Sequence, residues 1–260
     1  MTIPGFESHT ETLLDTERIV YRRGRGPAVL VLSEVPGITP QVARFARTVA
    51  DAGFSVWMPQ LFGTPMKPMN PLYAAQTLTR LCISREFRVP AANASSPIVD
   101  WLRALARCAH AACGGPGVGV VGMCITGNFG LAMMLDAPVI APVLAQPSLP
   151  GGPTAHQRAA LHASPQEIQA AQDKIERDGA RILGLRFKGD PLCRAERFEA
   201  LRDTFGPAFE AIELDDRHAK RGTFVPPHSM LTTHLIDKDG EPTRAALERT
   251  VGFLREQLQR

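Results

Sequence analysis

Short apolar runs alternate along this chain with longer segments of helical periodicity. The runs are rich in β-branched residues and end at glycine, proline or polar residues, which is typical of buried strands, whereas the longer segments are typical of amphipathic helices. The predicted strands cover residues 17–22, 28–32, 54–58, 118–123, 139–144, 181–187 and 208–214. The predicted helices cover residues 40–52, 72–88, 97–113, 131–135, 165–178, 194–205 and 242–259.

Several of these helices have recognisable start signals. Thr39, Ser96 and Ser164 each precede a proline, and a hydroxyl residue followed by proline is favoured at the start of a helix. Ser164 also has Glu167 three residues later, which makes a capping box. Strands that alternate with helices predict an α/β fold, with a mostly parallel sheet covered by helices on both faces. The chain has 260 residues, which fits a single domain over 1–260.

Composition narrows the class of protein. The chain is 44% hydrophobic and 21% charged, as in ordinary soluble globular proteins. Its net charge of +3 is small and scattered, which predicts no nucleic-acid partner. No apolar run approaches the length of a membrane span, and residues 1–14 lack the basic start and apolar core of a secretory signal. We therefore expect a cytoplasmic protein with no membrane partner.

The five cysteines are odd in number, irregularly spaced and without a C-x-x-C pair, so they predict neither a disulfide framework nor a zinc site. They are Cys82, Cys108, Cys113, Cys124 and Cys193. The sequence thus predicts reduced thiols and no bound metal.

One cysteine stands in a distinctive context. The apolar run at 118–123 leads into Gly122-Met123-Cys124-Ile125-Thr126-Gly127. A strand, a tight turn among small residues and a helix, with a nucleophile at the tip, is the logic of the nucleophile elbow, G-x-S-x-G. Here cysteine replaces serine and one extra residue precedes the last glycine. A helix N-terminus favours a thiolate at this position; the alternative is that Cys124 is a small buried apolar residue.

Polar residues follow other predicted strands as well. Glu34 and Asp190 come directly after strands, and His228 follows the loop after the last one. In mostly parallel sheets, function gathers at the carboxyl ends of the strands. The order Cys124, Asp190, His228 is the nucleophile–acid–histidine order of the α/β-hydrolases. The histidine would take the thiol proton and return it to a leaving group, while the acid would fix its tautomer.

Seven histidines compete for the role of base. We favour His228 because it lies between the last predicted strand and the terminal helix. His218 lies in a charged run, Asp215-Asp216-Arg217-His218, which favours a solvated loop, and His234 lies a few residues beyond His228.

At five places the sequence resembles the dienelactone hydrolase family. The segments are residues 33–38 (S-E-V-P-G-I), 59–63 (P-Q-L-F-G), 122–127 (G-M-C-I-T-G), 189–190 (G-D) and 228–229 (H-S). They occur in the family's order and span about residues 17–258. The resemblance implies an α/β-hydrolase fold and hydrolysis of an ester or lactone through a cysteine, without a cofactor.

The resemblance also implies roles for individual residues. Glu34 would hold the resting Cys124 thiol and swing away when substrate binds. The backbone N–H groups of Val35 and Ile125 would form the oxyanion hole. Phe62, in the segment 59–63, and Arg85 are candidates for contacts with the substrate.

The chain departs from the family pattern at two positions. Thr126 stands where the family elbow has the first of two closing glycines. The segment 230–232 lacks the arginine with which the dienelactone-cleaving members hold a substrate carboxylate, which argues against dienelactone itself as the substrate. Arg80, Arg85 or Arg88 could supply such a contact from elsewhere, although solvated helix arginines are common.

Two other functions fit the same residues. One is a thioesterase or other acyl-transfer enzyme that uses the same triad. The other is a non-catalytic binding or redox-sensing protein in which Cys124 is a target of peroxide. The leading hypothesis predicts a small-molecule ester or lactone as the partner of a monomer or small homo-oligomer.

Overall fold

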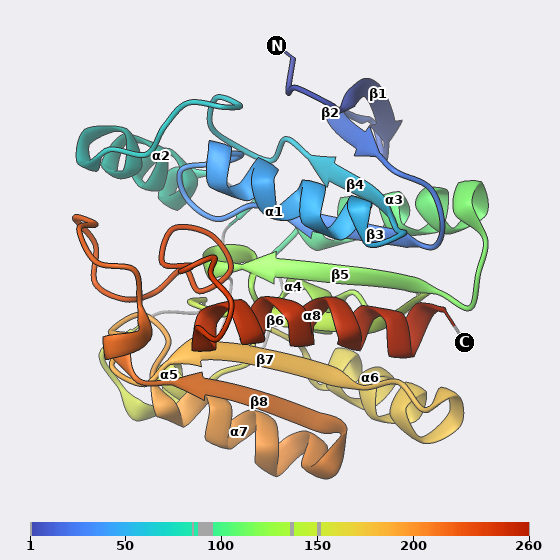
Figure 1. Cartoon of the computed structure of the whole chain (residues 1–260). Helices are drawn as coiled ribbons and strands as arrows, with labels where there is room; N and C mark the ends of the chain where they lie inside the picture. Colours follow the sequence, from blue (N-terminus) through green and yellow to red (C-terminus); the bar gives the residue numbers. More distant parts are fainter. Residues whose placement is uncertain (1, 85, 88–95, 136–137, 150–151, 260) are drawn as a thin grey trace.

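The computed structural model describes residues 2–84, 86–87, 96–135, 138–149 and 152–259. Its centre is an eight-stranded sheet in the order β1-β2-β4-β3-β5-β6-β7-β8 (Figure 1). The strands are β1 Glu7–Leu13, β2 Thr16–Arg23, β3 Ala28–Leu32, β4 Ser55–Pro59, β5 Val118–Met123, β6 Val139–Ala145, β7 Ile182–Phe187 and β8 Phe209–Leu214. The helices are α1 Pro40–Asp51, α2 Pro71–Ile83, α3 Ile98–Cys113, α4 Phe129–Ala132, α5 Ala155–Ala159, α6 Pro165–Asp178, α7 Ala195–Phe205 and α8 Pro242–Leu258.

The sheet is parallel from β4 to β8, as the alternation of elements predicts. β2 pairs antiparallel with β4, and β1 pairs antiparallel with β2. The sequence pattern did not predict β1, because none of its side chains is fully buried and it has no apolar run. The strand predicted at 17–22 is β2, and β1 rather than β2 forms the edge of the sheet.

Helices cover both faces of the sheet, which gives two apolar cores. Side chains of α1 and α8 pack with one set of strand residues, and side chains of α3, α4, α6 and α7 pack with the other. Consecutive residues of β3 contribute to opposite cores: Leu30 lies in the α3 core and Val31 in the α1 core. Complete burial of β5 and β7 on both faces explains why these strands are almost wholly apolar.

Helix starts follow the predicted signals at two of three positions. The Thr39 side chain accepts a hydrogen bond from the Val42 N–H at 3.3 Å, and Ser164 and Glu167 form the predicted capping box. Ser96 does not cap α3, which begins at Ile98 without a side-chain cap. Its hydroxyl instead contacts the His162 ring, because tertiary packing brings these two side chains together.

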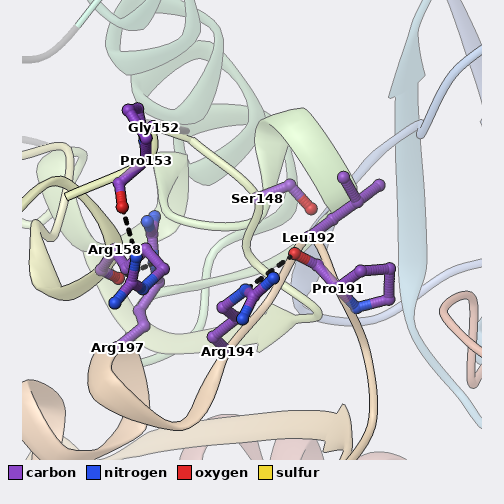
Figure 2. A pocket seen from close by; sticks show the side chains of 8 residues that line it. All are labelled: Ser148, Gly152, Pro153, Arg158, Pro191, Leu192, Arg194 and Arg197. Atoms are coloured by element: carbon purple, nitrogen blue, oxygen red, sulfur yellow. Dashed lines mark hydrogen bonds between the residues drawn. The ribbon is translucent and has the colours of Figure 1, made fainter. Parts of the chain in front are cut away.

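Three segments differ from the predicted elements. The helix predicted at 72–88 ends at Ile83, as α2. The helix predicted at 131–135 is the short α4, which covers Phe129–Ala132 and follows a 3₁₀ turn over Cys124–Thr126. Residues 146–162, for which no element is predicted, contain α5, which packs beside α7. A cavity of about 240 Å³ opens between these two helices and the end of β6 (Figure 2).

Among the helices of the described ranges, none has the length and apolarity needed to cross a membrane.

His162 is a buried histidine at the end of the α5 loop. Its Nε2 lies 2.9 Å from the Ser96 hydroxyl, and its ring stacks on Phe129 with 5.2 Å between centroids. Burial lowers the pKa of His162 to about 4, against the opposing effect of the Glu167 carboxylate. The imidazole is therefore neutral in the folded protein at any pH above that value.

We expect His162 to destabilise the fold in mild acid. At a pH below the pKa of His162 in the unfolded chain, the unfolded chain binds a proton that the folded chain does not. This lowers the free energy of unfolding by about 2 kcal/mol between pH 7 and pH 5. The free energy of unfolding of wild type and His162→Asn, measured at both values of pH, checks this, because asparagine tolerates the positive φ of 55° at this position and does not titrate. An equal loss in both proteins would contradict the assignment.

Candidate active site

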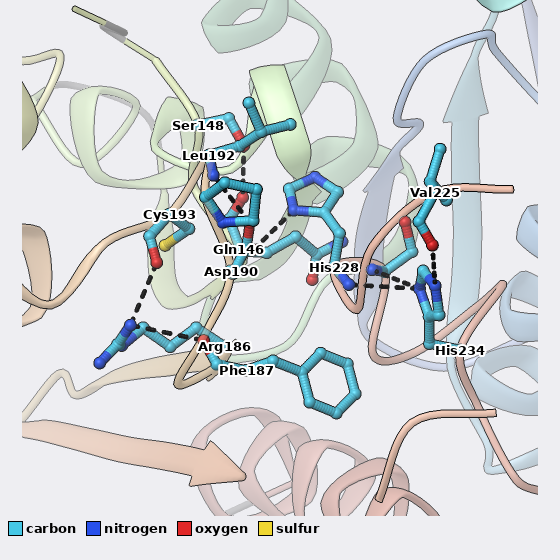
Figure 3. A network of polar contacts seen from close by, with 12 residues as sticks. Gln146, Ser148, Arg186, Phe187, Asp190, Leu192, Cys193, Val225, His228 and His234 are labelled. Atoms are coloured by element: carbon cyan, nitrogen blue, oxygen red, sulfur yellow. Dashed lines mark hydrogen bonds and ion pairs between the residues drawn. The ribbon is translucent and has the colours of Figure 1, made fainter. Parts of the chain in front are cut away.

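Four neighbouring strands deliver polar side chains to one edge of the sheet. Glu34 follows β3, Cys124 follows β5, Gln146 follows β6, and Asp190 lies just beyond β7. These strands are adjacent in the sheet and parallel, so their carboxyl ends meet at the same edge. His228 reaches this edge from the loop after β8, and Figure 3 shows it facing Asp190 beside Gln146.

The turn at Cys124 has the geometry of an elbow. Cys124 has a φ of 56°, in the left-handed region that non-glycine residues rarely adopt. A Cβ at Gly122 would lie 2.1 Å from the Thr126 carbonyl oxygen, and one at Gly127 would lie 2.4 Å from the Pro147 Cα. Both glycines are therefore required by close approach of backbone atoms, which is the steric reason for the motif.

Thr126 fits where the family pattern has glycine, because its hydroxyl is used by the turn. Its Oγ1 accepts a hydrogen bond from the Met123 N–H at 2.9 Å. The hydroxyl can donate to the carbonyl oxygens of Met123 at 3.0 Å or Leu32 at 3.1 Å. The fully buried side chain thus ties the elbow to the end of β3, so the departure from glycine does not open the turn.

Asp190 and His228 form a buried pair. His228 Nδ1 donates to Asp190 Oδ2 at 2.6 Å, and Asp190 Oδ1 accepts from the Leu192 N–H at 2.9 Å (Figure 3). Asp190 is 2% exposed and His228 9% exposed, so the contact is screened little by solvent. Both carboxylate oxygens are engaged, which fixes the plane of the carboxylate against the ring.

Burial and charge act on His228 in opposite directions. Burial alone would lower its pKa, but the neighbouring Cys124 and the hydrogen-bonded Asp190 carboxylate raise its pKa well above the ordinary value. The Nε2 atom has no hydrogen-bond partner among the described residues. The imidazole is therefore fixed through Nδ1 by the acid, while Nε2 stays available, and Cys124 is among the groups that act on its charge.

His234 holds the backbone at His228. Its Nδ1 accepts hydrogen bonds from the N–H groups of His228 at 3.3 Å and Ser229 at 3.0 Å. Its Nε2 therefore carries the proton and faces the Val225 carbonyl at 3.3 Å (Figure 3). Burial lowers the pKa of His234, which keeps this ring neutral. His218 lies apart from this arrangement, in a 3₁₀ turn over Asp216–His218.

Glu34 is held by neutral donors. Its Oε2 accepts from the Ser229 hydroxyl at 2.6 Å and the Gln146 amide at 3.2 Å, and its Oε1 accepts from the Thr232 hydroxyl. The resemblance implies a contact with the Cys124 thiol instead; in the structure the three other side chains are the donors. Ser229 and Thr232 belong to the loop that carries His228, so Glu34 joins this loop to the end of β3.

Gln146 and Thr232 were not singled out from the sequence. Gln146 directly follows the buried β6, which is the signal that singled out Glu34 and Asp190 and could have found it. Thr232 has no such signal, because only the folding of its loop over β3 brings its hydroxyl to Glu34.

The remaining predicted residues have different positions. Ile125 is the second residue of the 3₁₀ turn, where a backbone N–H has no partner within the turn. Val35 is partly buried and packs on the α3 core. Phe62 packs edge-to-face on Phe87, with 5.6 Å between centroids. Arg85, like Arg88, lies outside the described residues.

Phe62 begins a column of aromatic rings that leads toward the elbow helix. Phe87 stacks on Phe129 with 6.4 Å between centroids, and Phe129 is the first residue of α4.

Within the described ranges, no group of three or more histidine, cysteine, aspartate or glutamate side chains is arranged to hold a metal ion.

Comparison with known proteins identifies related sequences and folds. A model of the dienelactone hydrolase family matches residues 16–223. No curated protein matched the sequence.

Solved structures resemble the chain over almost its whole length. One is a dienelactone hydrolase from Anabaena variabilis, with 14% identity and a TM-score of 0.59 over 98% of this chain and 99% of that one. Another is a dienelactone hydrolase-like promiscuous phosphotriesterase from metagenomic libraries, with 16% identity and a TM-score of 0.60 over 98% of this chain and 99% of that one. A thioesterase domain from the curacin biosynthetic pathway has 10% identity and a TM-score of 0.55 over 95% of this chain and 99% of that one. At these identities the likeness shows a shared α/β-hydrolase-like fold.

We expect removal of the Thr126 hydroxyl to loosen the elbow. Thr126→Val keeps the shape of the side chain but leaves the buried Met123 N–H without its acceptor, which costs about 1–3 kcal/mol. Chemical denaturation of Thr126→Val and Thr126→Ser measures the loss, and serine, which keeps the hydroxyl, is the matched control. Equal stability of the valine and serine variants would show that the hydrogen bonds contribute nothing.

Proposed function

The chain belongs to the dienelactone hydrolase family, and from that membership we propose that it hydrolyses a carboxylic ester or lactone through Cys124. The observation that carries the proposal is the 2.6 Å hydrogen bond between His228 and Asp190, at the edge of the sheet where the Cys124 elbow turns. A nucleophile, a base and an acid that orients the base are the parts that acyl transfer to a side chain requires.

In the first half of the reaction, the Cys124 sulfur attacks the carbonyl carbon of the ester, and His228 holds the proton of the thiol. The tetrahedral intermediate collapses to a thioester, and the alcohol oxygen leaves with the proton from His228 Nε2. For a lactone the same bond breaks, but the alcohol stays attached to the acyl group. Asp190 keeps the Nδ1 proton in place and stabilises the imidazolium.

In the second half, His228 takes a proton from water, and the resulting hydroxide oxygen attacks the thioester carbon. The new intermediate collapses to the carboxylic acid, and the Cys124 sulfur leaves and recovers its proton from His228. In both halves the former carbonyl oxygen carries a negative charge in the tetrahedral intermediate. It accepts hydrogen bonds from the N–H groups of Val35 and Ile125. The position of Ile125 at the start of the 3₁₀ turn supports this role.

The enzyme works without a bound cofactor or metal. The residues needed for each step are side chains and backbone amides of this chain, so no cofactor or metal takes part. Phe62, which starts the aromatic column, contacts the apolar part of a small-molecule substrate. Residues 1–260 act as one domain, as a cytoplasmic monomer or small homo-oligomer.

A thioesterase or acyl-transfer activity would use the same steps with a sulfur leaving group. A redox-sensing protein, in contrast, would oxidise Cys124 stoichiometrically and turn over no ester. A panel of esters, lactones and thioesters, assayed with the wild-type protein, separates these three functions.

We expect Cys124→Ala and His228→Ala each to lower kcat by about three orders of magnitude or more, because members of a triad act as a unit. Turnover of the best ester in the panel, with circular dichroism to confirm folding, is the measurement. His218→Ala is the control and should keep wild-type turnover, because His218 lies outside the Asp190–His228 pair. Near wild-type activity of Cys124→Ala would remove the cysteine mechanism. Cys124→Ser should be weakly active at best.

We expect Glu34→Gln to lower kcat about tenfold with little change in KM. An amide has one accepting oxygen where the carboxylate has two, so the variant loses the hydrogen bond from Ser229 or from Thr232. A hydrogen bond to a charged acceptor stabilises the fold by about 1.5–3 kcal/mol. The change also removes a negative charge near the elbow, so alkylation of Cys124 by iodoacetamide should respond differently to pH. The exposed Glu17→Gln is the matched control. Superimposable alkylation curves and equal kcat would remove Glu34 from the mechanism.

A further inference from the structure

The cavity of about 240 Å³ beside α5 and α7 is next to the candidate active site. Ser148 and Leu192, which line it (Figure 2), form backbone hydrogen bonds with residues of the proposed triad. Ser148, on one wall, donates its backbone N–H to the Cys124 carbonyl at 3.0 Å. Leu192, on another, donates its N–H to Asp190 Oδ1 at 2.9 Å. A substrate group in this cavity would therefore lie against the same turn that carries the nucleophile.

The lining of the cavity is strongly basic. It includes Arg158, Arg194 and Arg197, and no carboxylate among the described residues that line it. Glu196, just outside the lining, accepts a hydrogen bond from Arg158 Nε at 2.6 Å. Asp190, which accepts from the Leu192 N–H, is a second carboxylate beside the cavity. Two carboxylates are thus set against three guanidinium groups, and this balance favours an anion.

The three arginines differ in how they are held. Arg197 is almost fully buried and donates to the carbonyl oxygens of Leu149, Gln157 and Arg158, which fixes the walls of the cavity. Arg194 makes one long hydrogen bond, from its Nε to the Pro191 carbonyl at 3.4 Å. The Nη groups of Arg194 are therefore the donors that the described contacts leave for a ligand, and Figure 2 shows this side chain between Arg197 and Leu192.

We propose that this cavity is a subsite for a small oxyanion, a carboxylate or a phosphate, carried by the substrate of the neighbouring Cys124 site. A guanidinium presents two parallel N–H donors to such a group, which gives both affinity and orientation. The inference rests on the proposed hydrolase function for the identity of the substrate, but the subsite itself is a property of the arginine-lined cavity. It selects esters or lactones that bear an anionic group over neutral ones.

Ion binding tests the subsite without any turnover. Isothermal titration of the wild-type protein with inorganic phosphate and with adipate should show binding of at least one, and the tighter ligand assigns the anion as phosphate or carboxylate. Arg194→Gln should weaken that binding about tenfold, the loss of one charge-assisted hydrogen bond. The control is Arg25→Gln, which removes the same charge from the exposed turn before β3 and should bind as wild type does. Absence of binding, or equal binding by Arg194→Gln, overturns the subsite.

Selectivity tests its link to the substrate. The para-nitrophenyl esters of hexanoic acid and of adipic acid, the latter as the half-ester, have acyl chains of equal length and differ by one terminal carboxylate. The ratio of kcat/KM for the acidic ester to that for the neutral one should fall about tenfold in Arg194→Gln and stay unchanged in Arg25→Gln. An unchanged ratio in Arg194→Gln overturns the role in substrate selection. Failure of the wild type to cleave either ester would count against the proposed function, while the titration would still decide the subsite.

Discussion

The structure depends on a turn that has no spare volume. Between β5 and α4 the backbone reverses so tightly that a single methyl group at Gly122 or Gly127 would overlap main-chain atoms. Cys124 accepts a left-handed backbone conformation in this turn, and the strain raises its side chain above the end of the sheet. Close packing against β3, which Thr126 completes with its hydroxyl, keeps the strained conformation in place.

The sheet then sets what surrounds the thiol. Because β3, β5, β6 and β7 are parallel neighbours, the residue that follows each of them arrives at the same edge. The loop after β8 adds His228, and two buried contacts fix that loop: the ring of His234 accepts from its backbone, and Glu34 accepts from its hydroxyls. Rigidity at the site therefore comes from one hydrogen bond within this loop and from others that join it to the distant end of β3.

The parts of this arrangement that could be predicted from the sequence are those governed by local rules. Apolar runs located the buried strands, and the polar residue after each of two strands located Glu34 and Asp190. What could not be predicted depends on contacts between distant segments. Ser96 has the pattern of a helix cap, but packing directs its hydroxyl to His162. The tight turn at Cys124 was predicted, but the helix predicted at 131–135 lies at Phe129–Ala132, after a 3₁₀ turn that the glycine contacts and the Thr126 hydrogen bonds hold in place. Likewise, β1 joins the sheet without an apolar run because it packs mostly through its backbone.

The two edges of the sheet end in different ways, and this has a consequence for association between chains. β1 is a polar strand, whereas β8 has apolar residues that could pair with another strand. Glutamates interrupt that edge: Glu210 accepts from Arg249 at 2.6 Å and Glu213 from Arg186 at 2.7 Å. A second strand that extended the sheet would lie over these ion pairs and would have to strip water from them. The charges on β8 therefore oppose edge-to-edge aggregation, and they let the sheet end at a strand that is otherwise suited to continue it.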